Sequence, residues 1–255
     1  MRPIERGNIP QATGVDKTVT DYKDWRQDLL ERIGNYCSYC NMVLNDSPQV
    51  EHVIPKNPQE GQPTGALLAW DNMLLACGAC NRAKDNKPHT STTHYIPDTN
   101  NTHLIFDYVV RFIHHSKKGT QVVCIPIPKN TLNADQQTKA QNTIDLCQLN
   151  ALTVNPRATD LRWKYRFEAW QSANLIWRKS WDSWGNVKPN DFIPLLIDAA
   201  TSKGFFSIWF EAFNDIPEAK IALINGFLGT ASASFQNIPP YNPIPRNPAD
   251  TTDTI

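Results

Sequence analysis

Two pairs of cysteines constrain the fold of this chain more than any other feature. They are Cys37-Ser-Tyr-Cys40 and Cys77-Gly-Ala-Cys80. Two intervening residues let both sulfurs of a pair reach one ion from a tight turn, and two pairs complete a tetrahedral thiolate zinc site. Because four thiolates leave no open coordination position, we expect this zinc to be structural. The alternatives are a redox CxxC motif or buried cysteines that bind nothing.

The composition is that of a soluble globular chain. Of its 255 residues, 40% are hydrophobic and 20% are charged, which is typical of a chain that buries a core. No apolar run approaches the roughly 20 residues that cross a bilayer, and the opening residues MRPIERGNIP contain no apolar secretory segment. We therefore expect a cytoplasmic protein without membrane contact, where cysteines are metal ligands more often than disulfides. Cys124 and Cys147, outside the pairs, are expected in the core.

The charge is balanced overall but unevenly distributed. The formal net charge is zero, so it does not by itself indicate a nucleic-acid partner. Residues 111–179 nevertheless hold 11 lysines and arginines against 4 acidic residues, whereas residues 182–255 hold 4 against 8. A basic middle is compatible with a polyanion on one face. Ordinary variation of the surface explains the same counts equally well.

The 36 residues between the cysteine pairs exceed the usual gap of a zinc ribbon, so this loop must contain structure of its own. Residues 49–55 predict a short strand that ends at a proline, and residues 56–65 predict a loop rich in glycine and proline. Residues 70–76 predict a second short strand, and residues 77–84 predict the beginning of a helix. The predicted order is strand, loop, strand and helix, with zinc holding both ends.

This arrangement, CxxC…EHxxP…DNxxxxCxxCNxxK, resembles the HNH (ββα-metal) endonuclease family in its zinc-braced branch, whose third motif residue is Asn. The resemblance covers residues 35–87, about a fifth of the chain. It implies an enzyme that hydrolyses phosphodiester bonds of nucleic acid with the help of a metal ion, with DNA favoured over RNA. The MRPI start and the additional helical region are also similar to the HNH nucleases of Septu-type antiphage systems (PtuB-like). That similarity implies a defence role and an ATPase partner protein.

Each motif residue has an expected role in the hydrolysis of a phosphodiester bond. His52 is the candidate general base, because imidazole titrates near neutral pH. Glu51 and Asn81 are candidate ligands of a catalytic Mg²⁺ or Mn²⁺, which prefer oxygen. Asn72 is placed to bond the backbone near His52 and to fix the orientation of the ring, a role that the resemblance implies and the spacing alone does not show. Glu51 replaces the more usual Asp of the family, and Asn81 replaces His, which favours a hard, oxygen-binding ion.

Two basic residues follow Asn81 and are candidate phosphate ligands. Asn81 and Lys84 are three residues apart, so on a helix they share a face. Lys84 is therefore expected to meet the phosphate beside the metal, and Arg82 to reach another phosphate. Taken alone, a Glu-His dipeptide is usually a pair of surface residues, and a basic stretch such as residues 80–84 is usually a solvent-exposed helix. The second hypothesis is accordingly a non-catalytic zinc module that binds nucleic acid or a partner protein.

We expect four parts in an α+β chain: a lead-in and helix (1–34), the zinc-braced HNH core (35–87), a larger region with one hairpin and mainly helices (88–235), and a proline-rich tail (236–255). The expected helices cover residues 21–33, 134–150, 158–184, 191–203 and 205–228. The expected hairpin joins strands at residues 104–113 and 120–127.

Aromatic residues recur along the longest expected helix at a spacing of three and four. They are Trp163, Phe167, Trp170, Trp177, Trp181 and Trp184. We interpret this stripe as a core face, with a base-stacking platform as the alternative. The histidines outside the motif are expected at the surface or in loops: His89, His94, His103, His114 and His115.

Overall fold

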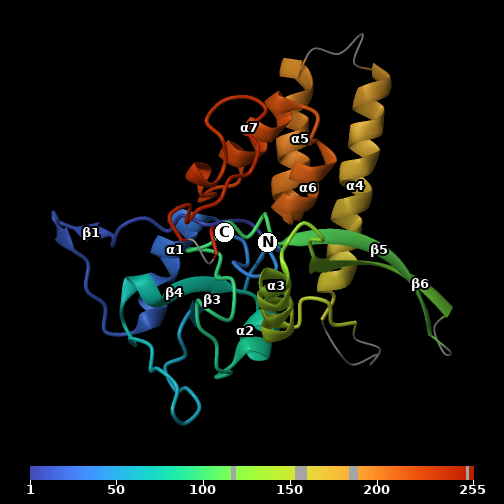
Figure 1. Cartoon of the computed structure of the whole chain (residues 1–255). Helices are drawn as coiled ribbons and strands as arrows, with labels where there is room; N and C mark the ends of the chain where they lie inside the picture. The colour runs from blue at the N-terminus through green and yellow to red at the C-terminus, as the bar shows by residue number, and fades with distance from the viewer. Residues whose placement is uncertain (116–118, 153–159, 184–188, 251–252) are drawn as a thin grey trace.

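The computed structural model describes residues 1–115, 119–152, 160–183, 189–250 and 253–255 (Figure 1). These residues form seven α-helices, three 3-10 helices (η) and three two-stranded antiparallel sheets, which confirms the expected α+β class. In chain order the elements are β1 (Gln11–Ala12), β2 (Val15–Asp16), η1 (Tyr22–Trp25), α1 (Arg26–Ile33), β3 (Gln49–His52), η2 (Trp70–Asn72), β4 (Met73–Ala76), α2 (Gly78–Lys84), β5 (Phe106–His115), β6 (Gly119–Pro128), α3 (Ala134–Cys147), α4 (Arg162–Ser183), α5 (Pro189–Lys203), α6 (Phe206–Ala212), α7 (Pro217–Gly226) and η3 (Ser232–Ser234).

The segment between the cysteine pairs folds as predicted, into strand, loop, strand and helix. β3 pairs antiparallel with β4, so that His52 lies opposite Met73. α2 follows β4 after a single residue, Cys77, and packs back against β3. In Figure 1 these elements occupy the lower left of the molecule, and the loop that joins the two strands hangs below them. The ββα arrangement expected for residues 35–87 is therefore present.

The helix predicted at residues 21–33 is present and covers one side of this core. It begins as η1 and continues as α1. The Asp21 side chain caps the first turn by accepting a backbone N–H, and Gly34, at φ 75°, ends the helix. Trp25 and Leu29, on its inner face, are almost completely buried. The spacing of the apolar residues thus identified both the helix and its buried side.

The two ends of the chain are more tightly packed than the sequence indicates. Met1 and Ile4 are each only 1% exposed. Ile255, after the proline-rich tail, is 5% exposed. All three side chains belong to the hydrophobic cluster that surrounds β3 and β4. Both terminal segments therefore help to enclose the ββα segment.

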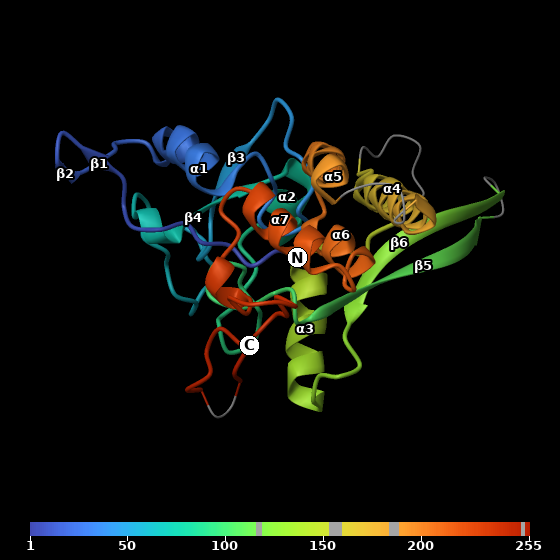
Figure 2. The ribbon, with the colours of Figure 1, turned by 90° about the horizontal axis from the view of Figure 1, so that it is seen from above.

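The predicted hairpin is present as β5 and β6, which pair along ten residues each. Figures 1 and 2 both show it extending away from the body of the molecule. α4 packs against β6 near the base of the hairpin. Farther out, Arg111 is exposed, and Phe112 is 77% exposed. Part of the predicted turn, residues 116–118, lies outside the described residues.

The aromatic stripe of α4 packs against a hydrophobic core through Phe167, Trp170 and Trp177, but it does not form the centre of the buried face. The residues with least exposure on this helix are Arg162, Arg166, Ala169 and Ala173. Trp163, Phe167, Trp170 and Trp177 are only half-buried along its margins. Alanines let α4 approach β6 and α6 closely, whereas an indole would hold the elements apart. The Trp181 side chain and Trp184 lie outside what the structure describes.

The single helix expected at residues 205–228 is two helices, α6 and α7. α6 ends at Ala212, and Pro217 is the first residue of α7. Proline lacks an amide hydrogen and is favoured in the first turn of a helix, where no intrahelical hydrogen bond is lost, so Pro217 begins a new helix. The apolar periodicity of the two helices continues across the break, which is why the sequence indicated one.

Two of the histidines expected at the surface or in loops lie outside helices and strands, but they are buried. His89 is 8% exposed and His103 is 2% exposed. The ring nitrogens of His89 lie within hydrogen-bond distance of the Lys87 and Val53 carbonyls. His103 contacts the Ser207 hydroxyl and packs among phenylalanines. Polar partners contributed by distant residues make this burial tolerable, and a single sequence does not reveal them.

Two hydrophobic clusters organise the chain. The first surrounds β3 and β4 and includes α1, α3 and the cysteine pairs, and the second joins α4, α5, α6 and α7. Cys124 and Cys147 are both 0% exposed, which confirms their expected place in the core. Among the described helices, none combines the length and apolar character that a bilayer crossing requires.

Candidate functional site

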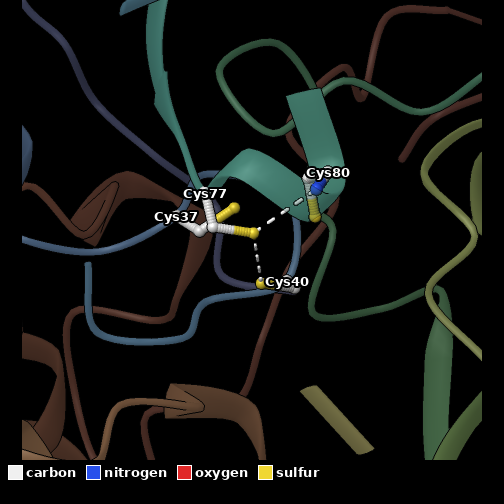
Figure 3. A group of neighbouring side chains, drawn as sticks. All are labelled: Cys37, Cys40, Cys77 and Cys80. Carbon is white, nitrogen blue, oxygen red and sulfur yellow. Dashed lines mark hydrogen bonds between the residues drawn. The ribbon is translucent and has the colours of Figure 1, made fainter. Parts of the chain in front are cut away.

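The four paired cysteines converge on one point. The sulfurs of Cys37, Cys40, Cys77 and Cys80 all lie within 4.8 Å of one another, and all four residues are buried (Figure 3). Cys37 and Cys40 come from a turn after α1, whereas Cys77 and Cys80 come from the start of α2. The Cys77 sulfur also accepts a hydrogen bond from the Cys80 amide and so caps α2. The spacing of the two pairs therefore predicted a real cluster.

The dimensions and chemistry of the cluster fit a tetrahedral zinc ion. Zn–S bonds of about 2.3 Å place neighbouring sulfurs about 3.8 Å apart in a tetrahedron, and the Cys40 and Cys77 sulfurs are 3.8 Å apart. Burial raises the pKa of the Cys37, Cys40 and Cys80 thiols well above their usual range. A bound cation would remove this penalty by stabilising the thiolates. The donor set is closed, as a structural site requires.

The turn that carries Cys37 and Cys40 is also hydrogen-bonded to β4, one of the two strands of the motif. The Ser38 amide donates to the Leu75 carbonyl of β4 over 2.8 Å. Cys80 is followed directly by Asn81, one of the candidate ligands of the catalytic ion. The position of Asn81 therefore depends on the cysteine cluster.

His52, the candidate base, lines a groove of about 300 Å³ at the end of β3. Its Nε2 is 3.0 Å from the Leu67 carbonyl oxygen. Because a carbonyl only accepts hydrogen bonds, Nε2 carries the proton in the neutral ring and Nδ1 is the basic nitrogen. Burial lowers the pKa of the imidazole below its usual value, and the charges of Lys56 and Lys84 lower it further, against the Leu67 hydrogen bond. The arrangement favours a neutral imidazole with one defined tautomer.

Asn72 joins the two backbone segments that flank His52. Its Oδ1 accepts a hydrogen bond from the Ile54 amide over 2.7 Å. Its Nδ2 donates to the carbonyls of Ile54 and Ala66, at 3.0 and 3.1 Å. Ala66 directly precedes Leu67, whose carbonyl contacts the imidazole. Asn72 thus lies where the sequence placed it, against the backbone near His52, and it also holds the segment that orients the ring.

Glu51 is held in a buried polar contact that the sequence did not predict. Lys84 Nζ lies 2.5 Å from its Oε1, and the Tyr39 hydroxyl donates to its Oε2 over 2.5 Å. Glu51 is 3% exposed. Burial raises the pKa of the Glu51 carboxyl, and the charge and hydrogen bond of Lys84 act in the opposite direction. Glu51 still lines the groove, and each carboxylate oxygen keeps a further lone-pair direction for another partner.

Lys84 lies away from its expected phosphate contact. It shares a face of α2 with Asn81, but it is 1% exposed and does not border the groove. Its ammonium donates to the His52 carbonyl over 2.8 Å and pairs with Glu51. The helical spacing correctly placed Lys84 on the same face of α2 as Asn81. At Lys84, however, this face packs into the core. Lys84 supports the backbone and carboxylate of the site instead of facing a substrate.

Asn81 and Arg82 both border the groove, as do residues that the motif did not indicate. The Asn81 amide nitrogen donates to Gln49 Oε1 over 2.9 Å, and none of the described residues donates to its Oδ1. Asp85, one turn further along the chain, adds an exposed carboxylate to the same groove. Asp85 follows the last residue of α2 at φ 45°, outside the helical conformation, so its spacing from Asn81 could not have indicated this position.

Two further groove residues lie on the side of His52. The Tyr22 ring, from η1, lies 4.6 Å from the imidazole, centroid to centroid, at 57°. Lys56 Nζ lies 4.6 Å from the centroid of the Tyr22 ring. Tyr22 precedes the motif by thirty residues, and nothing in its local sequence connects it with His52. Only the packing of the N-terminal helix brings it to the site.

Comparison with known proteins agrees with this geometry. Residues 37–87 match the family model described as HNH endonuclease, about a fifth of the chain. The chain matches no curated protein and no solved structure. The matched segment contains both cysteine pairs, both strands and α2. Residues 37–87 of this chain therefore form an HNH endonuclease domain, which makes the protein an enzyme of the nuclease type.

Proposed function

We propose that this protein is a metal-dependent endonuclease that cuts DNA, with His52 as the general base. One observation carries the proposal. His52 is fixed to the Leu67 carbonyl through Nε2 and borders the same groove as the oxygen donors Glu51 and Asn81. Base and ion ligands on one groove are what the hydrolysis of a phosphodiester requires, because a water must be deprotonated while charge develops on phosphate oxygens.

The imidazole performs the proton transfer in this scheme. Nδ1 takes a proton from the attacking water, and the Leu67 carbonyl then stabilises the imidazolium through the Nε2–H bond. A pKa lowered by burial keeps the free base populated at neutral pH. Asn72 is the positioning residue, because it holds Ala66 and Ile54 and thereby fixes the carbonyl that orients the ring.

Glu51 and Asn81 are the proposed ligands of the catalytic ion, and Asp85 is a further donor that the groove provides. The set is made of oxygens alone, which suits Mg²⁺ or Mn²⁺ better than softer metals. Mg²⁺ keeps several waters and needs only one or two carboxylates, so donors spread along an open groove fit it. Such an ion, when bound, stabilises charge on the phosphate and on the leaving oxygen.

Arg82 and Lys56 are the proposed phosphate contacts, because both are cations that border the groove. They replace the pair Arg82 and Lys84 that the sequence indicated, since Lys84 is buried in its contact with Glu51. We favour DNA over RNA, as the resemblance to the HNH family implies. For the cysteine cluster we propose a structural Zn²⁺.

A cleavage assay with purified protein tests this function directly. Single- and double-stranded DNA and RNA are incubated with Mg²⁺, Mn²⁺ or EDTA, and zinc content is measured in parallel. The wild type should cut DNA only with a divalent ion. His52→Ala should lose about 10²- to 10⁴-fold of that rate while keeping its zinc and its melting temperature.

The matched control is His94→Ala, because His94 is a half-buried histidine outside the groove. Its rate should stay at the wild-type level. Cleavage of every nucleic acid by His52→Ala at the wild-type rate would refute the assignment of the base. A wild type that binds DNA and never cuts it would support the second hypothesis, a non-catalytic zinc module. The ATPase partner and the role in antiphage defence stay predictions from the sequence.

A further inference from the structure

A buried arginine from α4 reaches the cysteine cluster from outside the HNH domain. Arg162 is 3% exposed, and its Nη1 lies 3.0 Å from the Cys80 sulfur. It is the first residue of α4, the long helix that packs against β6, α5 and α6. The match to the family model ends at residue 87, so this contact joins the cysteine cluster to a part of the chain outside the matched residues.

Every N–H group of the Arg162 guanidinium has a hydrogen-bond partner. An arginine has five N–H donors, and each of the five has a partner here. Nη1 donates to the Cys80 sulfur and to the Cys147 carbonyl, and Nη2 donates to the Gln148 carbonyl and to Asp160. Nε donates to the other oxygen of Asp160 over 2.9 Å. Without the sulfur, one buried N–H would lack a partner, so the contact is part of a built site.

We propose that Arg162 is a positioning residue of the metal centre, which holds Cys80 as a thiolate ligand and ties the helical region to the HNH domain. Four thiolates around one Zn²⁺ leave two negative charges in a buried place, which is costly unless hydrogen bonds offset them. A charged N–H donor is the strongest hydrogen bond that a buried thiolate can receive from a side chain. The proposal rests on zinc at the four cysteines but not on nuclease activity.

The contact has a consequence for the groove. Cys80 is followed by Asn81 and Arg82, which both border the candidate active site. A loosened Cys80 releases the first turn of α2, because the Cys77 sulfur caps that turn through the Cys80 amide. Metal binding and the docking of α4 must then stabilise each other, since coupling between two binding equilibria is reciprocal.

The experiment measures metal release from full-length protein. Zinc-loaded wild type, Arg162→Gln and Arg162→Lys are mixed with a chromophoric chelator, and the rate of zinc transfer is recorded. Arg166→Gln is the matched control: Arg166 lies one turn further along α4, is 1% exposed and donates to the Cys124 carbonyl, not to the cluster. Arg162→Gln should release zinc roughly 10- to 100-fold faster than the wild type. Arg162→Lys, which keeps one charged donor, should fall between them, and Arg166→Gln should match the wild type.

Cobalt substitution gives a second readout that does not depend on stability. Loss of an N–H···S bond raises the energy of the sulfur lone pairs, so the thiolate-to-cobalt band of Arg162→Gln should move to lower energy, and that of Arg166→Gln should not. Equal release rates in the two glutamine variants, or an unmoved band in Arg162→Gln, would overturn the role of Arg162 while leaving the zinc and the nuclease proposal standing. A wild type that contains no zinc would overturn both this inference and the proposed structural metal.

Discussion

Two sets of candidate metal ligands lie close together in the HNH domain, and they differ in how completely the fold assembles them. The four sulfurs of the cysteine cluster lie within 4.8 Å of one another in a buried place. The oxygen donors of the groove border a volume of about 300 Å³, and Glu51 is bonded to Lys84 and Tyr39. Zinc takes soft ligands directly, whereas Mg²⁺ keeps several waters. A closed metal site is therefore visible in the fold alone, whereas an open one is visible only as a groove with suitable donors.

Breaking the sulfur set should have the largest effect. Cys40→Ser removes one of four ligands, and structural zinc in small domains contributes about 10–16 kcal/mol of folding free energy. We expect loss of zinc and loss of the cooperative melting transition of the HNH domain, measured by metal analysis and circular dichroism. Cys124→Ser, a buried cysteine of β6 outside the cluster, is the control and should keep its zinc. Full zinc content in Cys40→Ser would contradict the proposal that the four cysteines form one closed zinc site.

Removing the cation beside Glu51 should have the next largest effect. Lys84→Met leaves a buried carboxylate without its partner, which costs about 3–5 kcal/mol of unfolding free energy at neutral pH. Because burial already raises the pKa of the Glu51 carboxyl, the variant should regain stability as the pH falls and the carboxyl takes up a proton. Urea denaturation at pH 5 and pH 8 measures both effects.

The double variant Glu51→Gln/Lys84→Met is the control for that pair. With both charges removed, it should recover much of the lost stability and lose the pH dependence. If Lys84→Met were as stable as the wild type at pH 8, the ion pair would not be the support of the groove that its burial indicates.

A smaller effect is expected when a side chain is added at Gly65, in the loop between β3 and β4. A Cβ at Gly65 would lie 2.0 Å from the Ile54 carbonyl oxygen and 2.5 Å from Asn72 Nδ2. Gly65→Ala must therefore displace the segment that carries Leu67, and a shift of that size can cost about 10²-fold in rate. Gly61→Asn, in open space of the same loop, is the control. Single-turnover cleavage rates compare the two, and unchanged rates in Gly65→Ala would show that His52 does not depend on this segment.

The smallest effect is expected in the pH profile. His52, the proposed base, would act when neutral, and burial lowers its pKa, so activity should fall only as the pH drops through a value below the usual 6.5 of histidine. The acidic limb of kcat/KM against pH reports this pKa for the free enzyme. Lys56→Ala removes a charge that lowers the pKa, so its limb should move to higher pH. A shift to lower pH would contradict the arrangement of charges around His52.

Much of the closed site and little of the open one could be predicted from the sequence. The cysteine pairs, the order of strands and helix, and the place of Asn72 near the His52 backbone follow from spacing and from the family resemblance. Tyr22 and Lys56 could not be foreseen as neighbours, because nothing in the sequence connects the N-terminal helix with the loop after β3. Lys84 was assigned to the correct helix face but to the wrong surroundings, since periodicity does not reveal what a face packs against.

The sequence by itself determined which residues could bind metal ions and how the segment around them folds, because ligand spacing and strand and helix patterns are local properties of the chain. Only the tertiary structure decided which nitrogen of His52 is basic, that Glu51 is shared with Lys84, and that Arg162 contacts the Cys80 sulfur. Each of these contacts joins residues that are distant from each other in the sequence. Burial and hydrogen bonds act through space, so their effect on charge and orientation appears only once the chain is folded.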